Sequence, residues 1–159
     1  MIIRAAGPDD AHALWALLAP VFRAGDTYAI DPCIDRAGAL AFWQAPEKTA
    51  FIAQDDTVLG TYYIKPNQGG GGAHVCNCGY ITAKAAKGRG VARAMLAHSL
   101  ETARSMGFVA MQYNFVVASN TRAIEIWERA GFRTVGRLPA AFEHPEQGRV
   151  DALIMWKDL

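Results

Sequence analysis

Residues 83–95 place two glycines and four cations directly before a helical pattern, in the stretch AKAAKGRGVARAM. A glycine lets the backbone approach a ligand without a Cβ in the way, and the free N–H groups at a helix start attract anions. The nucleotide P-loop and the dinucleotide fingerprint do not fit, because their following Gly-Lys-Ser/Thr or third glycine and acidic residue are missing. The stretch therefore predicts an anion site of another kind. A glycine-containing turn with solvated cations is the alternative.

The charge of the chain is segregated around this stretch. The formal net charge is +1, yet residues 57–100 contain no Asp or Glu. The cations of that segment are Lys65, Lys84, Lys87, Arg89 and Arg93. A loop that carries cations without carboxylates at a helix start suits a polyphosphate. The nearly neutral total gives no reason to expect a nucleic acid or a membrane as partner.

The hydrophobic pattern predicts alternating strands and helices in a single domain over residues 1–159. The expected strands are 1–6, a hairpin over 49–66, 74–82, 109–117, 132–138 and 150–157. The expected helices begin at Pro8, near Asp35, at Val91 and after Asn120. This alternation inside a mostly antiparallel scheme predicts an α+β fold, with α/β as the alternative, in which helices pack on one sheet.

Composition narrows the class of protein. The chain is 52% hydrophobic and 19% charged, which is ordinary for a soluble globular domain. Three cysteines predict reduced thiols and a cytoplasmic location, and two early aspartates speak against a secretory signal. His74, Cys76 and Cys78 alternate along one strand, but no paired ligand set stands elsewhere, so we expect no metal.

Two motifs resemble the GNAT superfamily of N-acetyltransferases. The stretch KGRGVA at 87–92 matches the pyrophosphate-loop pattern Arg/Gln-x-x-Gly-x-Gly/Ala at Gly90 and Ala92, with Lys87 in the first position. The stretch NTRAIEIWERAGF at 120–132 is similar to the later signature, which begins with asparagine and ends with Gly-Phe. The resemblance covers nearly the whole chain. It implies one mixed, mostly antiparallel sheet that is splayed in the middle and has helices on both faces.

The resemblance also implies acetyl-CoA as cosubstrate, lying between two splayed central strands. Its pyrophosphate would lie on a backbone loop made of Lys87, Gly88, Arg89, Gly90, Val91, Ala92 and Arg93. The pantetheine would be held by main-chain bonds from Ile81, Thr82 and Ala83. Asn120 would reach the pantetheine side of the cofactor.

The activity that this resemblance implies is an acyl transfer of the EC 2.3.1 type. The acceptor would be an amine of a small molecule, such as an amino acid-like compound, a polyamine or an amine antibiotic. Two alternatives stay open, a protein N-terminal or lysine acetyltransferase and a non-catalytic acyl-CoA-binding module. A homodimer is also left open.

The candidate catalytic residues differ from those that the resembled family commonly uses. The tyrosine that many family members use as acid is replaced by Trp127, and the strand before the loop has no carboxylate. That strand and its neighbour hold Asn77 and Asn114 within apolar runs. We predict that these two carboxamides act on the thioester carbonyl or on the substrate. The alternative is that they satisfy strand hydrogen bonds broken at the splay.

Three further side chains are candidates for the acceptor site. Tyr28 lies in GDTYAIDP between the first two predicted helices, where the family builds its acceptor pocket. Tyr113 would serve as an acid or as a pocket wall, and His144 would reach the site from the long connection between the last two strands. Turn packing, a core tyrosine and an exposed loop histidine are the respective structural alternatives.

Overall fold

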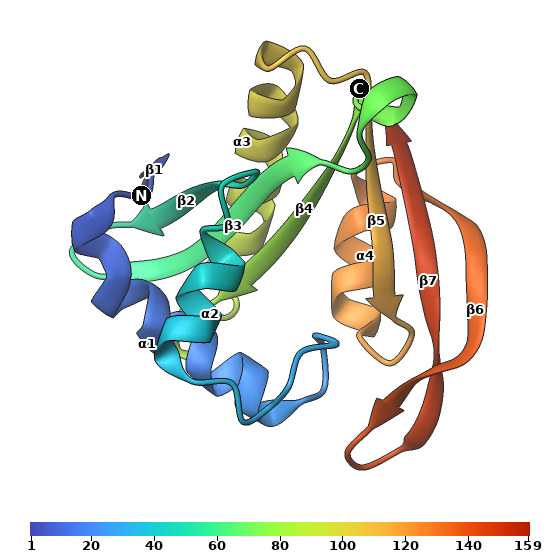
Figure 1. Ribbon diagram of the computed structural model, residues 1–159, viewed down its shortest axis with the longest axis horizontal. Coiled ribbons are helices and arrows are strands. Elements are labelled where there is room, and N and C mark those ends of the chain that lie inside the picture. The colour runs from blue at the N-terminus through green and yellow to red at the C-terminus, as the bar shows by residue number, and fades with distance from the viewer.

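The computed structural model describes residues 1–159 as a seven-stranded sheet with α1 and α2 on one face and α3 and α4 on the other (Figure 1). The strand order is β1-β2-β3-β4-β5-β7-β6. The strands are β1 Ile2–Ala5, β2 Thr49–Gln54, β3 Val58–Pro66, β4 Val75–Thr82, β5 Ala110–Val117, β6 Arg133–His144 and β7 Gly148–Asp158. The helices are α1 Ala11–Ala24, α2 Arg36–Trp43, α3 Val91–Ser105 and α4 Thr121–Arg129, with 3₁₀ turns at Pro8–Asp10, Gly70–Gly72 and Lys84–Ala86. The predicted α+β fold is confirmed.

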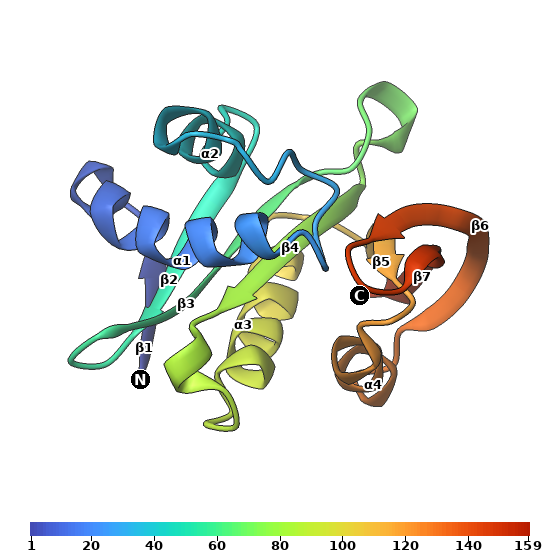
Figure 2. The ribbon, with the colours of Figure 1, turned by 90° about the horizontal axis from the view of Figure 1, so that it is seen from below.

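The sheet divides between β4 and β5, its only parallel pair. These strands pair at Val75–Ala110 and at Cys76–Met111 and then separate, a divergence that is visible from below (Figure 2). On the sides that face away from each other, both strands stay paired. β4 pairs with β3 as far as Thr82, and β5 pairs with β7. The facing edges of β4 and β5 beyond the second pair therefore have no strand partner.

Local sequence sets the helix ends near this division. Asp35 caps α2 by accepting a 2.7 Å hydrogen bond from the Gly38 N–H. Gly131 ends α4 with φ of +89°, and the Phe132 N–H returns to the Trp127 carbonyl at 3.0 Å. Asn120 is the N-cap of α4, but its side chain makes no cap bond. None of the helices is long and apolar enough to cross a membrane.

Two hydrophobic cores lie on the two faces of the sheet. On the α1/α2 face the largest fully buried side chain is Trp43, whose indole N–H donates to the Thr61 hydroxyl at 3.0 Å. On the opposite face Met95 of α3 and Met111 of β5 are fully buried, and Trp127 extends the core to α4. The first core packs on β2, β3 and β4 alone, whereas the second contains residues of both β4 and β5, such as Cys78 and Tyr113, and therefore spans the separation of these two strands.

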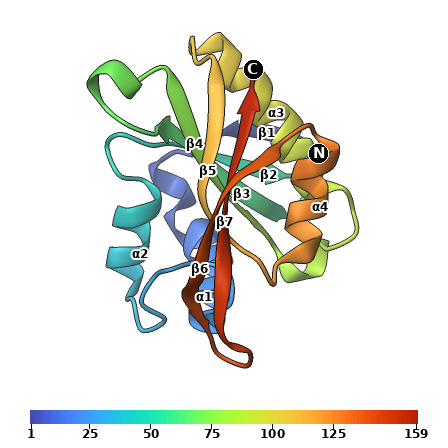
Figure 3. The ribbon, with the colours of Figure 1, turned by 90° about the vertical axis from the view of Figure 1, so that its right-hand side faces the viewer.

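The last hairpin is longer than the sequence predicts. Predicted strands end at 138 and restart at 150, whereas β6 continues to His144 and β7 begins at Gly148. The pairing resumes after a register shift between Leu138 and Phe142, which leaves an irregularity that the strand pattern does not reveal. The hairpin extends along one end of the molecule (Figure 3).

We predict that Gly60→Ala destabilises the fold. A Cβ at Gly60 would lie 2.8 Å from the Ile81 carbonyl oxygen and 2.9 Å from the Met95 Cε. Overpacking of this kind costs about 1–3 kcal/mol, so thermal unfolding should show a melting temperature lowered by roughly 2–10 °C. Gly71→Ala is the control, because a Cβ there meets nothing within 4 Å. Equal melting temperatures for the two variants would contradict this packing.

Candidate active site

The separation of β4 from β5 opens a cavity of about 1240 Å³ that runs from the α1–α2 connection to α4. It brings together residues that lie far apart in the sequence. The predicted site residues that line it are Tyr28, Asn77, Ile81, Thr82, Ala83, Lys87, Gly88, Gly90, Val91, Ala92, Arg93, Tyr113, Asn114 and Asn120. Two predicted residues, Arg89 and His144, do not line it.

The loop before α3 presents free backbone donors to this cavity. The N–H groups of Gly88 and of residues 90–93 donate no backbone hydrogen bond. Gly88 and Gly90 have φ of +85° and +79°, and a Cβ on either would meet no protein atom within 4 Å. The glycines therefore serve the left-handed backbone and leave open space beside it. Free N–H groups at the start of a fifteen-residue helix make an anion site.

Arg89 has a different position from the one that the sequence suggests. Its guanidinium forms an ion pair with Asp55 at 2.7 Å, outside the cavity lining. Both side chains are partly exposed, so the pair adds little stability. It ties the loop to the β2–β3 turn. The acid-free segment 57–100 thus meets a carboxylate from just before it in the chain.

Asn77 bridges the two strands where their ladder stops. Its side-chain amide donates to the Gln112 carbonyl at 2.9 Å, and its oxygen lies 3.5 Å from the Tyr63 hydroxyl. This arrangement matches the structural role that was the alternative for Asn77. Its side-chain hydrogen bond replaces a backbone hydrogen bond that is missing where the strands separate. Asn114 is exposed, and its side chain bonds with Gln112 and Asn67.

The end of the cavity beneath α1 and α2 is aromatic. The Tyr28 hydroxyl donates to the Tyr80 carbonyl at 3.0 Å. A Cβ on Gly79 would lie 2.6 Å from the Tyr63 ring and 3.0 Å from the Tyr28 hydroxyl, so only glycine lets both rings approach β4. Burial raises the pKa of Tyr28 well above its usual value and that of Tyr63 to about 12. Both hydroxyls stay neutral at working pH.

Sequence reasoning misses two lysines at this end. The Lys48 ammonium lies 3.5 Å from the Phe42 ring centroid and 4.4 Å from that of Tyr63, and donates to the Phe42 carbonyl. Burial, together with nearby Lys65, lowers the pKa of Lys48 to about 8, while Glu47 opposes the shift. Strand alternation, which puts Tyr63 and Lys65 on one face, is the signal that would have placed Lys65 here, whereas no local signal places Lys48.

Tyr113 lines the cavity from the α4 side. Its hydroxyl donates to the Tyr80 hydroxyl at 3.2 Å, which bonds with Ser99 at 2.7 Å. The Trp127 ring lies 5.0 Å from the Tyr80 ring and 5.2 Å from the Tyr113 ring. Burial raises the pKa of both tyrosines well above the usual value. They therefore stay protonated and can donate hydrogen bonds, but neither is a base.

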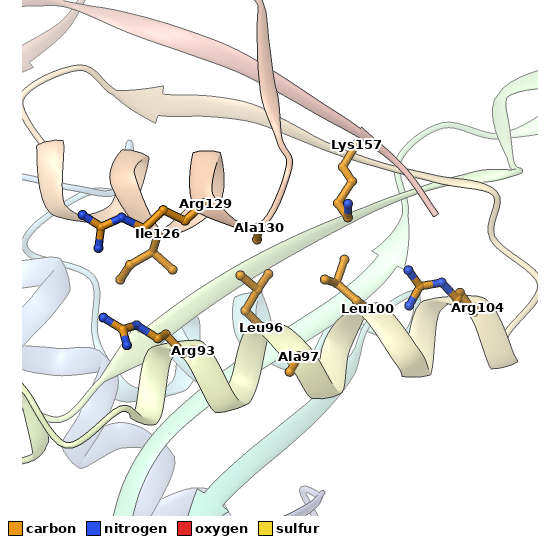
Figure 4. A pocket seen from close by; sticks show the side chains of 9 residues that line it. All are labelled: Arg93, Leu96, Ala97, Leu100, Arg104, Ile126, Arg129, Ala130 and Lys157. Carbon is orange, nitrogen blue, oxygen red and sulfur yellow. The ribbon is translucent and has the colours of Figure 1, made fainter.

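A second cavity of about 410 Å³ lies between α3 and α4 (Figure 4). Arg93 and Arg129 lie at one end and Arg104 and Lys157 at the other, above an apolar floor that includes Leu96. Arg93 and Arg129 line both cavities. The second cavity therefore extends the first from the glycine loop along α3.

The remaining candidates lie elsewhere. His144 accepts hydrogen bonds from the backbone of Glu146 and Gln147 in the β6–β7 turn. It sits there because β6 continues where the sequence predicts a loop. Cys76 and Cys78 are buried small side chains, and no group of three or more His, Cys, Asp or Glu is placed to hold a metal ion.

The family model of the GNAT acetyltransferases, described as "Acetyltransferase (GNAT) family", matches residues 12–132. The chain belongs to the GNAT acetyltransferase family. This confirms the family that the two motifs predict. Among curated proteins, N-acetyltransferase aca1 of Schizosaccharomyces pombe is 35% identical over 107 residues, which are 67% of this chain. The chain spans about half of that relative's length, 51%.

Solved structures share the whole fold. A GNAT protein from Kribbella flavida has a TM-score of 0.94 at 37% identity. The match covers 99% of this chain and 97% of the Kribbella flavida chain. Two others share the fold at lower identity. They are a ribosomal-protein-alanine N-acetyltransferase from Brucella melitensis (TM-score 0.87, 22% identity, full coverage of both chains, each 100%) and a phosphinothricin acetyltransferase from Sinorhizobium meliloti in complex with AcCoA (0.85, 17%, 99% and 88%). The names of these two proteins give different acceptors.

For this GNAT protein we predict that Gly90→Val weakens coenzyme A binding at least tenfold, about 1.4 kcal/mol or more, because the side chain fills the space beside the free N–H groups. Gly107→Val is the matched control. Gly107 has φ of +86° and open surroundings at the far end of α3, so the backbone strain is the same. Calorimetry should show weaker binding only for Gly90→Val. Equal affinity of the two variants would contradict the site.

We also predict that Asn77→Leu lowers the free energy of unfolding by about 1–3 kcal/mol, because the Gln112 carbonyl loses its partner. Asn114→Leu should leave stability almost unchanged, since Asn114 is exposed. Denaturation curves and steady-state kinetics on both variants separate scaffold from chemistry. A kcat loss of roughly 10²–10³ would show that a carboxamide stabilises the oxyanion. Unchanged stability of Asn77→Leu would contradict the bridging role.

Proposed function

We propose that this protein transfers an acetyl group from acetyl-CoA directly to the amine of a small molecule. One observation carries the proposal. The free N–H groups of the glycine loop, the unpaired edges of β4 and β5, and a compact aromatic pocket all line one continuous cavity. The loop suits a pyrophosphate, the strand edges suit the amides of pantetheine, and the pocket suits an acceptor.

In this proposal the cofactor lies with its pyrophosphate on Gly88 and residues 90–93. Pantetheine bonds to the main chain at residues 81–82. Ala83, which the sequence also predicts, has no free N–H, because that group donates to the Leu59 carbonyl at 2.8 Å. Asn120, whose side chain makes no cap bond, faces the pantetheine from the start of α4. The nucleotide end of coenzyme A carries a further phosphate. Arg93 and Arg129 at the second cavity offer cations for it.

The chemistry needs little from the side chains. A neutral amine attacks the thioester carbon, the C–N bond forms, and the C–S bond breaks as the thiolate leaves. The proton that the amine loses reaches the thiolate directly or through water. Since no carboxylate stands on β4 and Trp127 has no usable proton, positioning of the two reactants supplies most of the rate.

A small acceptor is favoured by the walls of the pocket. The α1–α2 connection, with Tyr28, lines the acceptor end, and the rings of Phe42 and Tyr63, whose centroids are 6.4 Å apart, form one of its walls. A protein N-terminus or lysine on an extended peptide would need an open groove. The protein acetyltransferase and the non-catalytic acyl-CoA-binding module are therefore the second and third candidates. A cytoplasmic location and a homodimer stay predictions.

A turnover assay tests the proposal. Free thiol should be released from acetyl-CoA only when a small amine is present, and mass spectrometry should find the N-acetyl product. Coenzyme A binding without amine-dependent thiol release would identify a binding module. Faster acetylation of an alanine-started peptide or a lysine peptide than of any small amine would favour a protein acceptor.

The pH dependence of kcat is a further prediction. We expect a single rising limb, due to deprotonation of the acceptor amine. No falling limb from a tyrosine should appear, because burial keeps the pKa of each cavity tyrosine raised. A falling alkaline limb that disappears in Tyr80→Phe would show that a protein acid takes part after all.

A further inference from the structure

The acceptor end of the cavity carries positive charge. Lys48 and Lys65 both line it. The Lys48 ammonium lies 4.4 Å from the centroid of the Tyr63 ring, and Lys65 follows Tyr63 by two residues in β3. Lys65 stands opposite Asn77 in the β3–β4 register, so its side chain shares the face on which Tyr63 and Asn77 meet. Burial and, to a smaller extent, the charge of Lys65 lower the pKa of Lys48. Both ammonium groups line the end of the cavity at which we propose that the acceptor binds.

Lys48 still has hydrogen-bonding capacity. An ammonium group has three donors, and the only bond that Lys48 makes is to the Phe42 carbonyl. Two N–H donors remain for a ligand. Its stem and charge lie against the Phe42 and Tyr63 rings, which hold the side chain in one place and reduce its contact with water.

Few carboxylates balance these cations. Of the residues that line the cavity only Asp26 and Glu125 are acidic. Glu125 lies on α4 and is paired with Arg129 at 3.5 Å, so it belongs to the other side of the cavity. Neither lysine forms an ion pair within 4.0 Å, although Glu47 lies near Lys48. The positive charge is therefore available to an anion.

We propose that the acceptor is an amino acid or a close analogue, whose carboxylate is bound by Lys48 and Lys65 while its amine faces the thioester. This inference rests on the proposed function and makes its acceptor class specific. A carboxylate would satisfy the free ammonium donors by charge-assisted bonds. A polyamine or a polycationic antibiotic would place further positive charge beside two lysines and is excluded by repulsion.

The first test compares each standard L-amino acid with its own carboxamide, and both with spermidine, at saturating acetyl-CoA. A carboxamide lowers the pKa of the neighbouring amine, so chemistry alone favours the amide. A kcat/KM for the best free acid at least tenfold above that of its carboxamide supports the carboxylate site. Equal or faster acetylation of the carboxamide or of spermidine overturns it and leaves the small-amine activity intact. If coenzyme A binds and no amine in the panel reacts, both proposals are overturned.

The second test uses Lys48→Met and Lys65→Met, which keep length and remove charge. Each should raise KM for the free acid roughly tenfold to a hundredfold, the usual effect of losing a charge-assisted bond. KM for the carboxamide and kcat should change by less than about threefold. Arg149→Met, on the exposed part of β7 outside both cavities, is the control. Equal increases in KM for acid and carboxamide would indicate a structural role and overturn the inference.

A third readout isolates the enzyme's own titration. The N-acetylated amino acid is the product and has no ionisable amine, so the pH dependence of its inhibition constant reports groups of the protein. Inhibition should weaken as the pH rises through about 8, where Lys48 loses its proton, and this change should be absent in Lys48→Met. The facing groups are Lys65, Glu47, Asp26 and the neutral tyrosines. An inhibition constant that stays the same across this pH range would contradict binding of the carboxylate by Lys48.

Discussion

The interrupted ladder between β4 and β5 is the constraint on which the rest of the structure depends. Two residue pairs form, at Val75 and Cys76, and beyond them the facing backbone edges of both strands have no strand partner. Unpaired backbone N–H and C=O groups are costly unless water or a ligand satisfies them. Asn77 bridges the first gap from its side chain, and the core on the α3/α4 face contains residues of both strands. The groove is therefore a built feature of the fold, and it suits a ligand that carries its own amides.

Charge gives this groove a direction. One end has a helix start with free N–H groups and cations, which attract phosphates. The other end has two lysines beside aromatic rings. Between them the side chains are neutral, because burial keeps the tyrosines protonated and β4 carries no carboxylate. Such a site can bind and align two anionic reactants but offers few proton carriers. In the proposed reaction, catalysis therefore depends more on the alignment of the two reactants than on acid–base chemistry.

The sequence predicts most of the fold because its signals are local. Gly88, Gly90 and Gly131 each mark a backbone position that the structure shows as left-handed, and the helical and strand periods locate the elements on each side. The errors come from contacts between distant segments. Arg89 pairs with Asp55 across the β2–β3 turn, and the β6–β7 hairpin extends beyond the pattern through an irregular register. Lys48 escapes notice because its aromatic partners come from α2 and β3, which only the folded chain brings together.

The central claim is that acetyl-CoA occupies the separation between β4 and β5. Hydrogen–deuterium exchange of the backbone amides, with and without acetyl-CoA, tests it most directly. We predict slower exchange in two segments, residues 77–83 of β4 and its following turn, and residues 88–93 at the start of α3, because ligand bonds replace solvent at these N–H groups. The β6–β7 hairpin should be unaffected. Protection confined to other segments, or none at residues 77–93 under saturating acetyl-CoA, would contradict the account.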